Sequence, residues 1–206
     1  MHDRCWKIWI AVSTSDSQNA SGPANRSGGG IAFGGGSRAQ AHPRAVPSEL
    51  IAAMRRRWAS GIAVVAAVDA GGGLRGVTVS SLMIVSQEPP VLAVALTAGS
   101  SFQELAVAGA TLGVSVLDAT HEFAAERFAG RAPLPDAHFT GVAHGLVEGI
   151  PVLDGALAWC RGRVLQRDAI GDHVLVLLEV TAGDLGSDTD DPLLSYEGRY
   201  RRLEAS

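Results

Sequence analysis

The segment from Gly76 to Leu96, GVTVSSLMIVSQEPPVLAVAL, decides the fold of this chain. Its two ends are rich in Val, Leu and Ala, which predicts strands, and the prolines at 89 and 90 interrupt the run between them. Hydroxyl side chains break the apolar pattern at Thr78, Ser80, Ser81 and Ser86. The segment therefore predicts strand, loop and strand, with uncharged hydrogen-bonding groups along a mostly buried sheet.

Similar apolar runs lie on both sides of this segment. IAVVAAV (62–68) predicts a buried strand, which the glycine-rich turn 69–75 joins to an antiparallel partner at 76–81. A long hairpin with a Gly-Asp turn is expected from 155–167 and 174–183. Further strands are expected at 90–96, at 111–117 and through 192–204.

Helices are expected at three places. The first begins at an N-cap, Ser48, carries an apolar stripe and ends at Gly61. A short helix follows Ser100 or Ser101, another covers 119–130, and 131–150 is expected to be irregular. Since strands and helices do not alternate regularly, the pattern favours a mainly β fold, a small antiparallel barrel with peripheral helices.

Composition divides the chain into two parts. Residues 1–46 are predicted to be a flexible, low-complexity tail, because 12–46 are dominated by Gly, Ser, Ala and Asn. Residues 47–206 are predicted to form one domain. Hydrophobic residues make up 47% of the chain, which favours a packed globule over a disordered binder.

The charge and the cysteines exclude several classes of protein. A formal net charge of -4 and the absence of a basic patch argue against nucleic-acid binding, and the arginines at 55–57 and 199–202 are interpreted as solvated surface. Only Cys5 and Cys160 are present, so no disulfide framework is expected. No apolar run is long enough for a membrane helix, and a cytoplasmic protein is expected.

The common catalytic motifs are absent from the sequence. Its six histidines form neither HExxH nor a Cys/His zinc spacing, so no metal site is expected. Neither GxSxG nor a GxGxxG between strand and helix occurs. Hydroxyls and backbone amides around a sheet suit a neutral, planar ligand with polar edges, such as a flavin, although such hydroxyls equally serve to bond neighbouring backbone.

Six pieces of the sequence, in this order and spacing, resemble the flavin reductase-like family of short NAD(P)H:flavin oxidoreductases. They are MRRRWASGIAVVAAV (54–68), the opening segment 76–96, ERFAG (126–130), GIPVLDGALAWCRGRV (149–164), GDHVLVLLEV (171–180) and PLLSYEGRY (192–200). The resemblance implies an antiparallel FMN-binding split β-barrel. It also implies a flavin site along the opening segment.

The residues implied to contact the flavin ring are Thr78, Val79, Ser80, Ser81, Leu82, Met83, Val85 and Ser86. Ser100 and Ser101 match the loop for the flavin phosphate, with Arg127 and Phe128 of ERF as further cofactor-binding residues. Two departures leave the choice between FMN and FAD open. The phosphate loop lacks the Arg or Lys that many members carry, and Ile84 stands where Ser is frequent.

The resemblance also implies a nicotinamide site. His173 of the GDH triplet would lie close to the flavin and the nicotinamide, and it is the one catalytic residue that the resemblance implies. The alternative interpretation is that His173 only stabilises a hairpin turn. Four residues of the C-terminal segment match the part that approaches the pyridine nucleotide, namely Tyr196, Gly198, Arg199 and Tyr200. Arg199 could pair with nucleotide phosphates, or be an ordinary exposed arginine.

The function implied by the resemblance is hydride transfer from NADH or NADPH to FMN or FAD, by a homodimer that supplies reduced flavin to a partner monooxygenase. Three alternatives remain open. The chain could be a non-catalytic FMN carrier or sensor, a barrel that has lost flavin and acts in protein interactions, or an oxidoreductase with another cofactor, such as a deazaflavin or haem.

Overall fold

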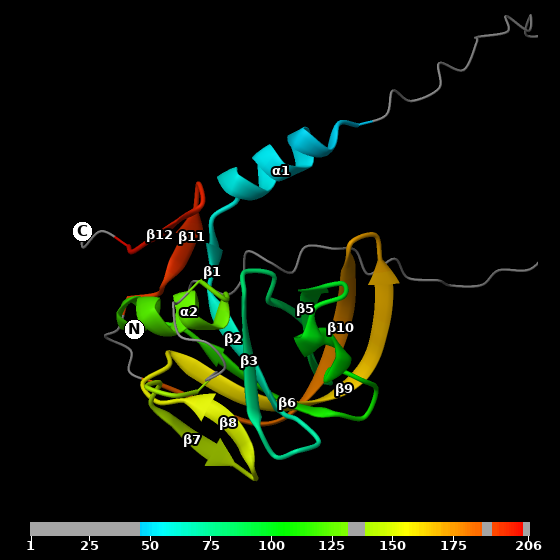
Figure 1. The fold of residues 1–206 in the computed structure, drawn as a ribbon, viewed down its shortest axis with the longest axis vertical. Helices are drawn as coiled ribbons and strands as arrows, with labels where there is room; N and C mark the ends of the chain where they lie inside the picture. The colour runs from blue at the N-terminus through cyan, green and yellow to red at the C-terminus, as the bar shows by residue number, and fades with distance from the viewer. Residues whose placement is uncertain (1–45, 132–138, 187–190, 204–206) are drawn as a thin grey trace, which may run out of the picture. The chain divides into compact units, whose positions relative to one another are not determined.

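The computed structural model describes residues 46–131, 139–186 and 191–203 (Figure 1). The predicted tail therefore lies outside the described residues, except for Val46. No helix within the described ranges has the length and apolar character needed to cross a membrane.

A seven-stranded antiparallel sheet forms the body of the fold, in the spatial order β3-β2-β6-β9-β10-β5-β4. Its strands are β2 (Ala63–Val68), β3 (Leu74–Val79), β4 (Met83–Gln87), β5 (Pro90–Thr97), β6 (Thr111–Val116), β9 (Ala158–Ile170) and β10 (His173–Leu185). The sheet curls until β3 contacts β5, which closes one side of a barrel (Figure 1). The predicted mainly β, antiparallel split-barrel fold is confirmed.

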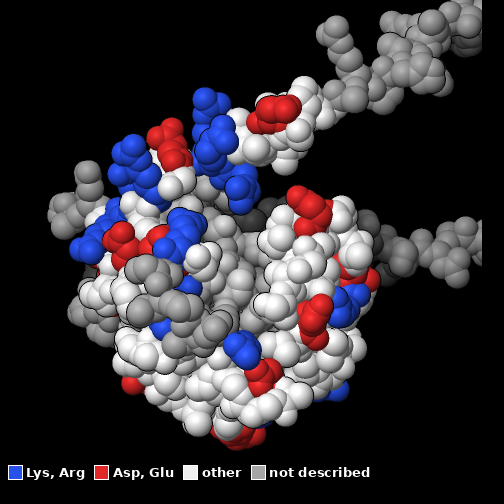
Figure 2. All heavy atoms as spheres, in the orientation of Figure 1, with Lys and Arg blue, Asp and Glu red and all other residues white. Residues whose placement is uncertain are grey.

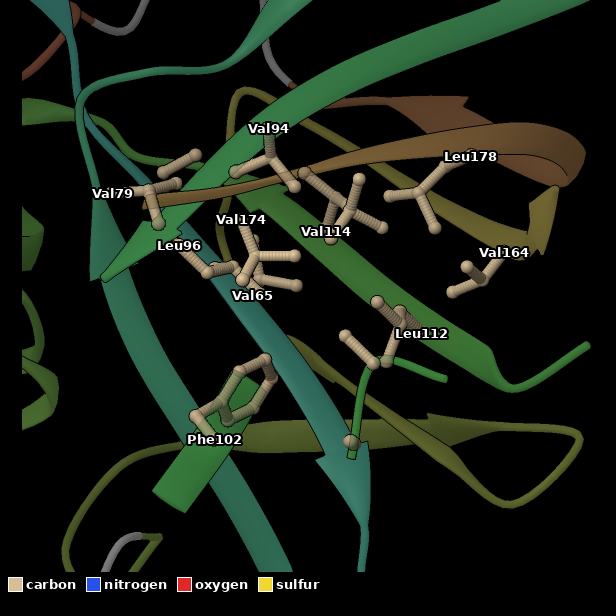
Figure 3. Packing of buried hydrophobic residues seen from close by; sticks show 14 residues of the cluster. Val65, Val79, Val94, Leu96, Phe102, Leu112, Val114, Val164, Val174 and Leu178 are labelled. Carbon is tan, nitrogen blue, oxygen red and sulfur yellow. The ribbon is translucent and has the colours of Figure 1, made fainter. Parts of the chain in front are cut away.

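Strand β2 lies between two hydrophobic clusters. Ala63, Val65 and Ala67 face the barrel interior, where they join β5, β6 and β10 (Figure 3). Val64 and Ala66 point the opposite way, into a second cluster under helix α2 (Glu122–Phe128). Because alternate residues of a strand face opposite sides, a strand buried on both sides has no polar positions. This explains the unbroken apolar run that predicted it.

Glycines allow the layers around this strand to approach closely. A Cβ on Gly76 of β3 would lie 2.6 Å from the ring of Phe128 in α2. A Cβ on Gly113 of β6 would lie 2.4 Å from the carbonyl oxygen of Pro151, in the hairpin of β7 (His144–Val147) and β8 (Ile150–Leu153). Both glycines are therefore required by packing, one under α2 and one under the β7–β8 hairpin.

A second small sheet attaches the C-terminal segment to the start of the domain. It contains β1 (Ser60–Gly61), β11 (Leu194–Tyr196) and β12 (Arg199–Arg201). The β11–β12 turn, Glu197 and Gly198, has φ values of 53° and 74°, as a tight two-residue hairpin turn requires. The Glu197 amide donates to the Arg56 carbonyl at 2.7 Å, and this ties the hairpin to the end of helix α1 (Ser48–Arg57).

The structure corrects the first predicted helix. Pro47, with extended backbone, is the N-cap in place of Ser48, and the helix ends at Arg57 because Gly61 pairs with Leu194 in a sheet. The predicted apolar stripe is present, but none of the residues of α1 is buried. Its members, which are all exposed, are Leu50, Ile51, Met54 and Trp58.

Other predicted elements also change. The loop expected after Ser81 contains strand β4, and the expected irregular stretch 131–150 contains β7. The single last strand is a hairpin, β11–β12. The short helix after Ser100 is only the 3₁₀ turn η2 (Ser101–Glu104), and the helix at 119–130 is a 3₁₀ turn, η3 (Ala119–His121), followed by α2.

Candidate functional site

A polar pocket of about 680 Å³ lies where α1, β1, the end of β3, α2 and the β11–β12 hairpin meet. It brings together six of the predicted site residues: Thr78, Val79, Ser80, Gly198, Arg199 and Tyr200. The strand expected along the flavin thus shares one pocket with the segment expected at the pyridine nucleotide. We call this the arginine pocket, because Arg55, Arg56, Arg131 and Arg199 line it.

The carboxylates of the arginine pocket are Glu122 and Glu126, both on α2. Arg131 donates to Glu126 at 3.0 Å. Burial, and a hydrogen bond to Glu126, raise the pKa of Tyr200 to about 12. The phenol therefore stays neutral near pH 7 and can donate to that carboxylate. With four arginines against two glutamates, the pocket keeps an excess of positive charge.

Two of the hydroxyls predicted to face a flavin are bound to protein backbone. The Thr78 hydroxyl donates to the carbonyl of Ala125 in α2 at 2.6 Å. The Ser81 hydroxyl donates to the Ala95 carbonyl at 2.9 Å and accepts from the Ala95 amide at 3.1 Å. Each hydroxyl has only one hydrogen to donate. In this structure, neither is free to donate to a ligand, and both connect β3 to its neighbours.

The other predicted ring-contacting residues divide into core and surface. The Val79 side chain is buried in the barrel core, and Leu82 packs against it. Met83 and Val85 are exposed on β4, the edge strand of the sheet, where Ser86 is half-buried. Val79 and Leu82 can thus contact a ligand only through their backbone groups, whereas the side chains of β4 are accessible.

His173 lies in a second pocket, of about 780 Å³, between α1 and the β9–β10 turn. Its Nδ1 lies 2.8 Å from the Asp172 carboxylate, which can only accept, so Nδ1 carries a proton and, in the neutral imidazole, Nε2 is the nitrogen that can accept. The hydrogen bond from His173 is the largest cause that lowers the pKa of Asp172. Asp172 therefore fixes the orientation of the imidazole.

The predicted phosphate loop lies beside this second pocket. Thr97 of β5 pairs with His173 and lines the pocket, and the Ala98 amide donates to the Asp172 carbonyl at 3.0 Å. Ser100 then returns its hydroxyl to the Thr97 carbonyl at 2.8 Å, and Ser101 starts η2. The loop and the histidine, more than seventy positions apart, are thus neighbours because β5 and β10 pair.

Phe128, Arg127 and Tyr196 are among the predicted residues that line neither pocket. Phe128 is buried in the second hydrophobic cluster, where its ring lies 4.8 Å from the ring of Phe139. Arg127, beside it on α2, is 7% exposed. Tyr196 lies on β11, outside the lining of the arginine pocket. The first two belong to the packing of α2 on the barrel.

Sequence reasoning missed Arg55, Arg56 and Trp58. They were interpreted as solvated surface and as a helix stripe, yet all three line the arginine pocket. The available signal was their position at the end of a helix, directly before the first strand. What the sequence did not reveal is that the β11–β12 hairpin, from the far end of the chain, pairs beside them.

Cys160 is a partly buried residue of β9, and burial raises its pKa to about 11. At neutral pH it is therefore an unreactive thiol. Among the described residues, no group of three or more His, Cys, Asp or Glu side chains could hold a metal ion.

The chain is similar to known proteins over most of its described residues. It is 36% identical over 135 residues to the FMN reductase (NADH) RutF of Methylorubrum extorquens, covering 66% of this chain and 65% of that protein, or just under two thirds of its length. It is similar in structure to the NADH:FAD oxidoreductase SgcE6 of Streptomyces globisporus, with TM-score 0.67 and 28% identity over 78% of this chain and 97% of that chain.

A second structural relative is the styrene monooxygenase flavin reductase of Pseudomonas putida S12. Its TM-score is 0.65 and its identity 30%, over 74% of this chain and 96% of that chain. The model of the flavin reductase like domain matches residues 54–204, which include every residue that lines the arginine pocket and, from the second pocket, Thr97, Asp172 and His173. The arginine pocket, which joins the end of β3 to the β11–β12 hairpin, lies within this matched range, and the chain belongs to the flavin reductase-like domain family.

Proposed function

We propose that this protein is an NADH-dependent flavin reductase, which transfers a hydride from NADH to FMN or FAD. The observation that carries the proposal is the arginine pocket. There Thr78, Val79 and Ser80 line the same pocket as Arg199 and Tyr200, in a chain of the flavin reductase-like family. One pocket thus combines the strand proposed for the flavin with the segment proposed for the nucleotide.

The residues present fit a flavin nucleotide. Both pockets have volumes within the range of about 300–1,000 Å³ that is usual for ligand sites. Backbone groups at 78–80 can meet the polar edge of a planar ring, and Ser101 offers a hydroxyl and an amide for a phosphate, whereas the hydroxyl and the amide of Ser100 already donate to the Thr97 carbonyl. When bound, the flavin supplies the hydride acceptor, and the protein binds and orients the reactants.

His173 is proposed to orient the nicotinamide. Asp172 accepts from Nδ1 and thereby leaves Nε2 to accept a hydrogen bond from a carboxamide. The side chain is 43% exposed and lines the second pocket, so a ligand can reach it. Because a fixed imidazole needs no reorganisation when the substrate binds, this arrangement favours a well-defined substrate geometry.

We further propose that the protein is a homodimer. Met83, Ile84 and Val85 are consecutive exposed apolar residues on an edge strand, and α1 exposes a second apolar stripe. Exposed apolar edges of this kind are normally covered in a soluble protein. A second copy, placed over β4, would cover residues that are also proposed to contact the flavin.

The proposed biological role is supply of reduced flavin to a partner monooxygenase in the cytoplasm. Its support is the similarity to the flavin reductase of styrene monooxygenase, at 30% identity.

Purified protein should oxidise NADH, followed by the loss of its absorbance, only when FMN, FAD or riboflavin is added. Comparison of the three flavins, and of NADH with NADPH, gives the preferred pair. Binding of flavin without NADH oxidation would instead favour the FMN carrier or sensor. Failure to bind any flavin would favour a barrel that uses another cofactor or acts in protein interactions.

His173→Ala should lower the rate of hydride transfer about tenfold or more, because the nicotinamide loses its orienting contact. Flavin affinity should change little. Stopped-flow reduction of the bound flavin separates the two effects. His144→Ala is the matched control, since His144 bonds the Val142 carbonyl in the β7 region, away from both pockets. Unchanged hydride transfer in His173→Ala would contradict the role.

A further inference from the structure

Three guanidinium groups around the arginine pocket form no hydrogen bond or ion pair within the described part of the chain, although the charge of Arg55 also acts on Asp172 of the second pocket. Among the described residues, the side chains of Arg55, Arg56 and Arg199 make no hydrogen bond or ion pair, whereas Arg131 pairs with Glu126. These unpaired arginines come from two separate elements, the end of α1 and strand β12. Figure 2 shows arginines gathered over this part of the molecule, interspersed with a few acidic side chains.

The positions of these arginines are fixed by backbone contacts. The Arg56 carbonyl accepts from the Glu197 amide at 2.7 Å, and this bond connects the end of α1 to the β11–β12 turn. Arg199 follows that turn directly and pairs with Tyr196 in β12–β11. The two elements therefore hold Arg56 and Arg199 on one pocket without any direct bond between their side chains.

The ligand suited to this pocket is an anion with more than one charge. Guanidinium groups bind phosphate oxygens through paired N–H donors, which makes arginine the usual residue for phosphate recognition. Hydroxyls of Ser60, Ser80 and Ser195 line the same pocket and can add hydrogen bonds. Glu122 offsets only part of the positive charge, since Glu126 is already paired with Arg131.

Trp58 gives the pocket an aromatic surface. It lies between Arg56 and Ser60, lines the pocket and is 76% exposed. Exposed aromatic side chains beside a positively charged groove typically stack on nucleobases. The combination of unpaired arginines, hydroxyls and an accessible indole is therefore suited to a nucleoside diphosphate.

We propose that the arginine pocket binds the ADP moiety of a dinucleotide, with its pyrophosphate on Arg55, Arg56 and Arg199 and its adenine on Trp58. This inference deepens the proposed function and rests on it for the source of the ADP group, which NADH and FAD both contain and FMN lacks. It assigns a ligand-binding role to the end of α1, and it makes this region a determinant of dinucleotide affinity.

The direct test is calorimetric binding of ADP to the full chain. ADP should bind the wild type, and Arg56→Ala and Arg199→Ala should each weaken the affinity about tenfold, because each removes a charged hydrogen bond to phosphate. Arg57→Ala and Arg201→Ala are matched controls, since these arginines neighbour the first two on the same elements but do not line the pocket. Both controls should bind ADP as the wild type does.

Removal of a negative charge from the pocket, in place of a positive one, tests the role of charge in ADP binding. Glu122→Gln should tighten ADP binding about two- to threefold, as removal of an exposed, unpaired carboxylate has a small effect. The same affinity should fall as the salt concentration rises, because the pocket is open to solvent. Trp58→Ala should weaken ADP more than it weakens inorganic pyrophosphate, which has no base to stack.

Kinetic measurements identify the source of the ADP group. With FMN as the flavin, an increase in the KM for NADH in Arg56→Ala assigns the pocket to NADH. A loss of FAD affinity with unchanged FMN affinity assigns it to FAD. Wild-type ADP affinity in Arg56→Ala and Arg199→Ala, or no ADP binding by the wild type, would overturn the inference even if flavin-dependent NADH oxidation is intact. ADP binding without such oxidation would instead overturn the proposed function alone.

Discussion

Strands β4 and β5 are neighbours in one sheet, yet they differ in almost every physical respect. β5 lies between β4 and β10 and buries Val91, Ala93, Val94 and Leu96. β4 forms the edge, and of its five residues only Ser86 is partly buried. Both strands are apolar in sequence. The amino-acid composition of a strand thus predicts which of its residues favour burial. The position of the strand in the sheet decides whether one copy of the chain can bury them.

The largest expected effect of a substitution lies in β5. Leu96→Ala should lower the free energy of unfolding by about 3 kcal/mol, because it leaves a cavity beside Val65, Phe102 and Val174 in the barrel core (Figure 3). Chemical denaturation at a fixed protein concentration measures the loss. Ile84→Ala on β4, at 64% exposure in one copy of the chain, should change the same quantity by less than about 0.5 kcal/mol at a protein concentration low enough to keep the chain monomeric. Equal losses of unfolding free energy in the two variants would show that β4 and β5 contribute equally to the stability of the fold.

The second effect concerns what covers β4. Ile84→Glu should raise the dissociation constant of the proposed dimer about tenfold or more, because a charge would be buried in the interface without a partner. Sedimentation velocity over a range of concentrations measures it. Leu146→Glu, on an equally exposed residue of β7, should leave the dimer unchanged. A protein that stays dimeric as Ile84→Glu would exclude β4 from the interface.

The third-largest effect is expected for Ser81, in the loop before β4. The Ser81 hydroxyl bonds both backbone groups of Ala95 and so continues the hydrogen bonding of β5 beyond the end of β4. Ser81→Ala should destabilise the fold by about 1 kcal/mol, since the Ala95 groups lose their partner but remain near solvent. Hydrogen exchange of the Ala95 amide should become faster. A loss of flavin affinity with unchanged stability would instead favour the contact predicted from the sequence.

Most of the barrel could be predicted from the sequence. The run at 62–68 and the Gly-Asp turn between 155–167 and 174–183 specify β2 and the β9–β10 hairpin, because local signals decide these elements. Strand β4 was missed, since Met83–Gln87 is short, does not alternate and carries a bulge opposite β5. Edge strands often lack a pattern because no core selects one face of them.

The site was only partly predictable, because its contacts join distant segments. Thr78 was predicted to lie along a flavin, and in the structure its hydroxyl donates to the Ala125 carbonyl, 47 positions away. No local pattern predicts such a bond. In the same way, Arg55 and Arg56 gain a possible role only because the β11–β12 hairpin pairs next to β1. The resemblance to the family located the segments, and the fold determined which of their atoms are free.

The smallest expected effect lies where β5 meets the β9–β10 turn. The pKa of Asp172 is lowered chiefly by its hydrogen bond from His173, so its ionised form is favoured in the folded state. A lowered pKa contributes stability above the unfolded-state pKa, and that contribution is lost as the pH falls through the folded-state value. Asp172→Asn should therefore lower the melting temperature slightly at about pH 5, and the difference from the wild type should shrink as the solution is acidified from there toward about pH 3. Melting curves of both proteins across this range test the sign, and a difference that grows on acidification would show that Asp172 acts on β5 by some means other than its ionised carboxylate.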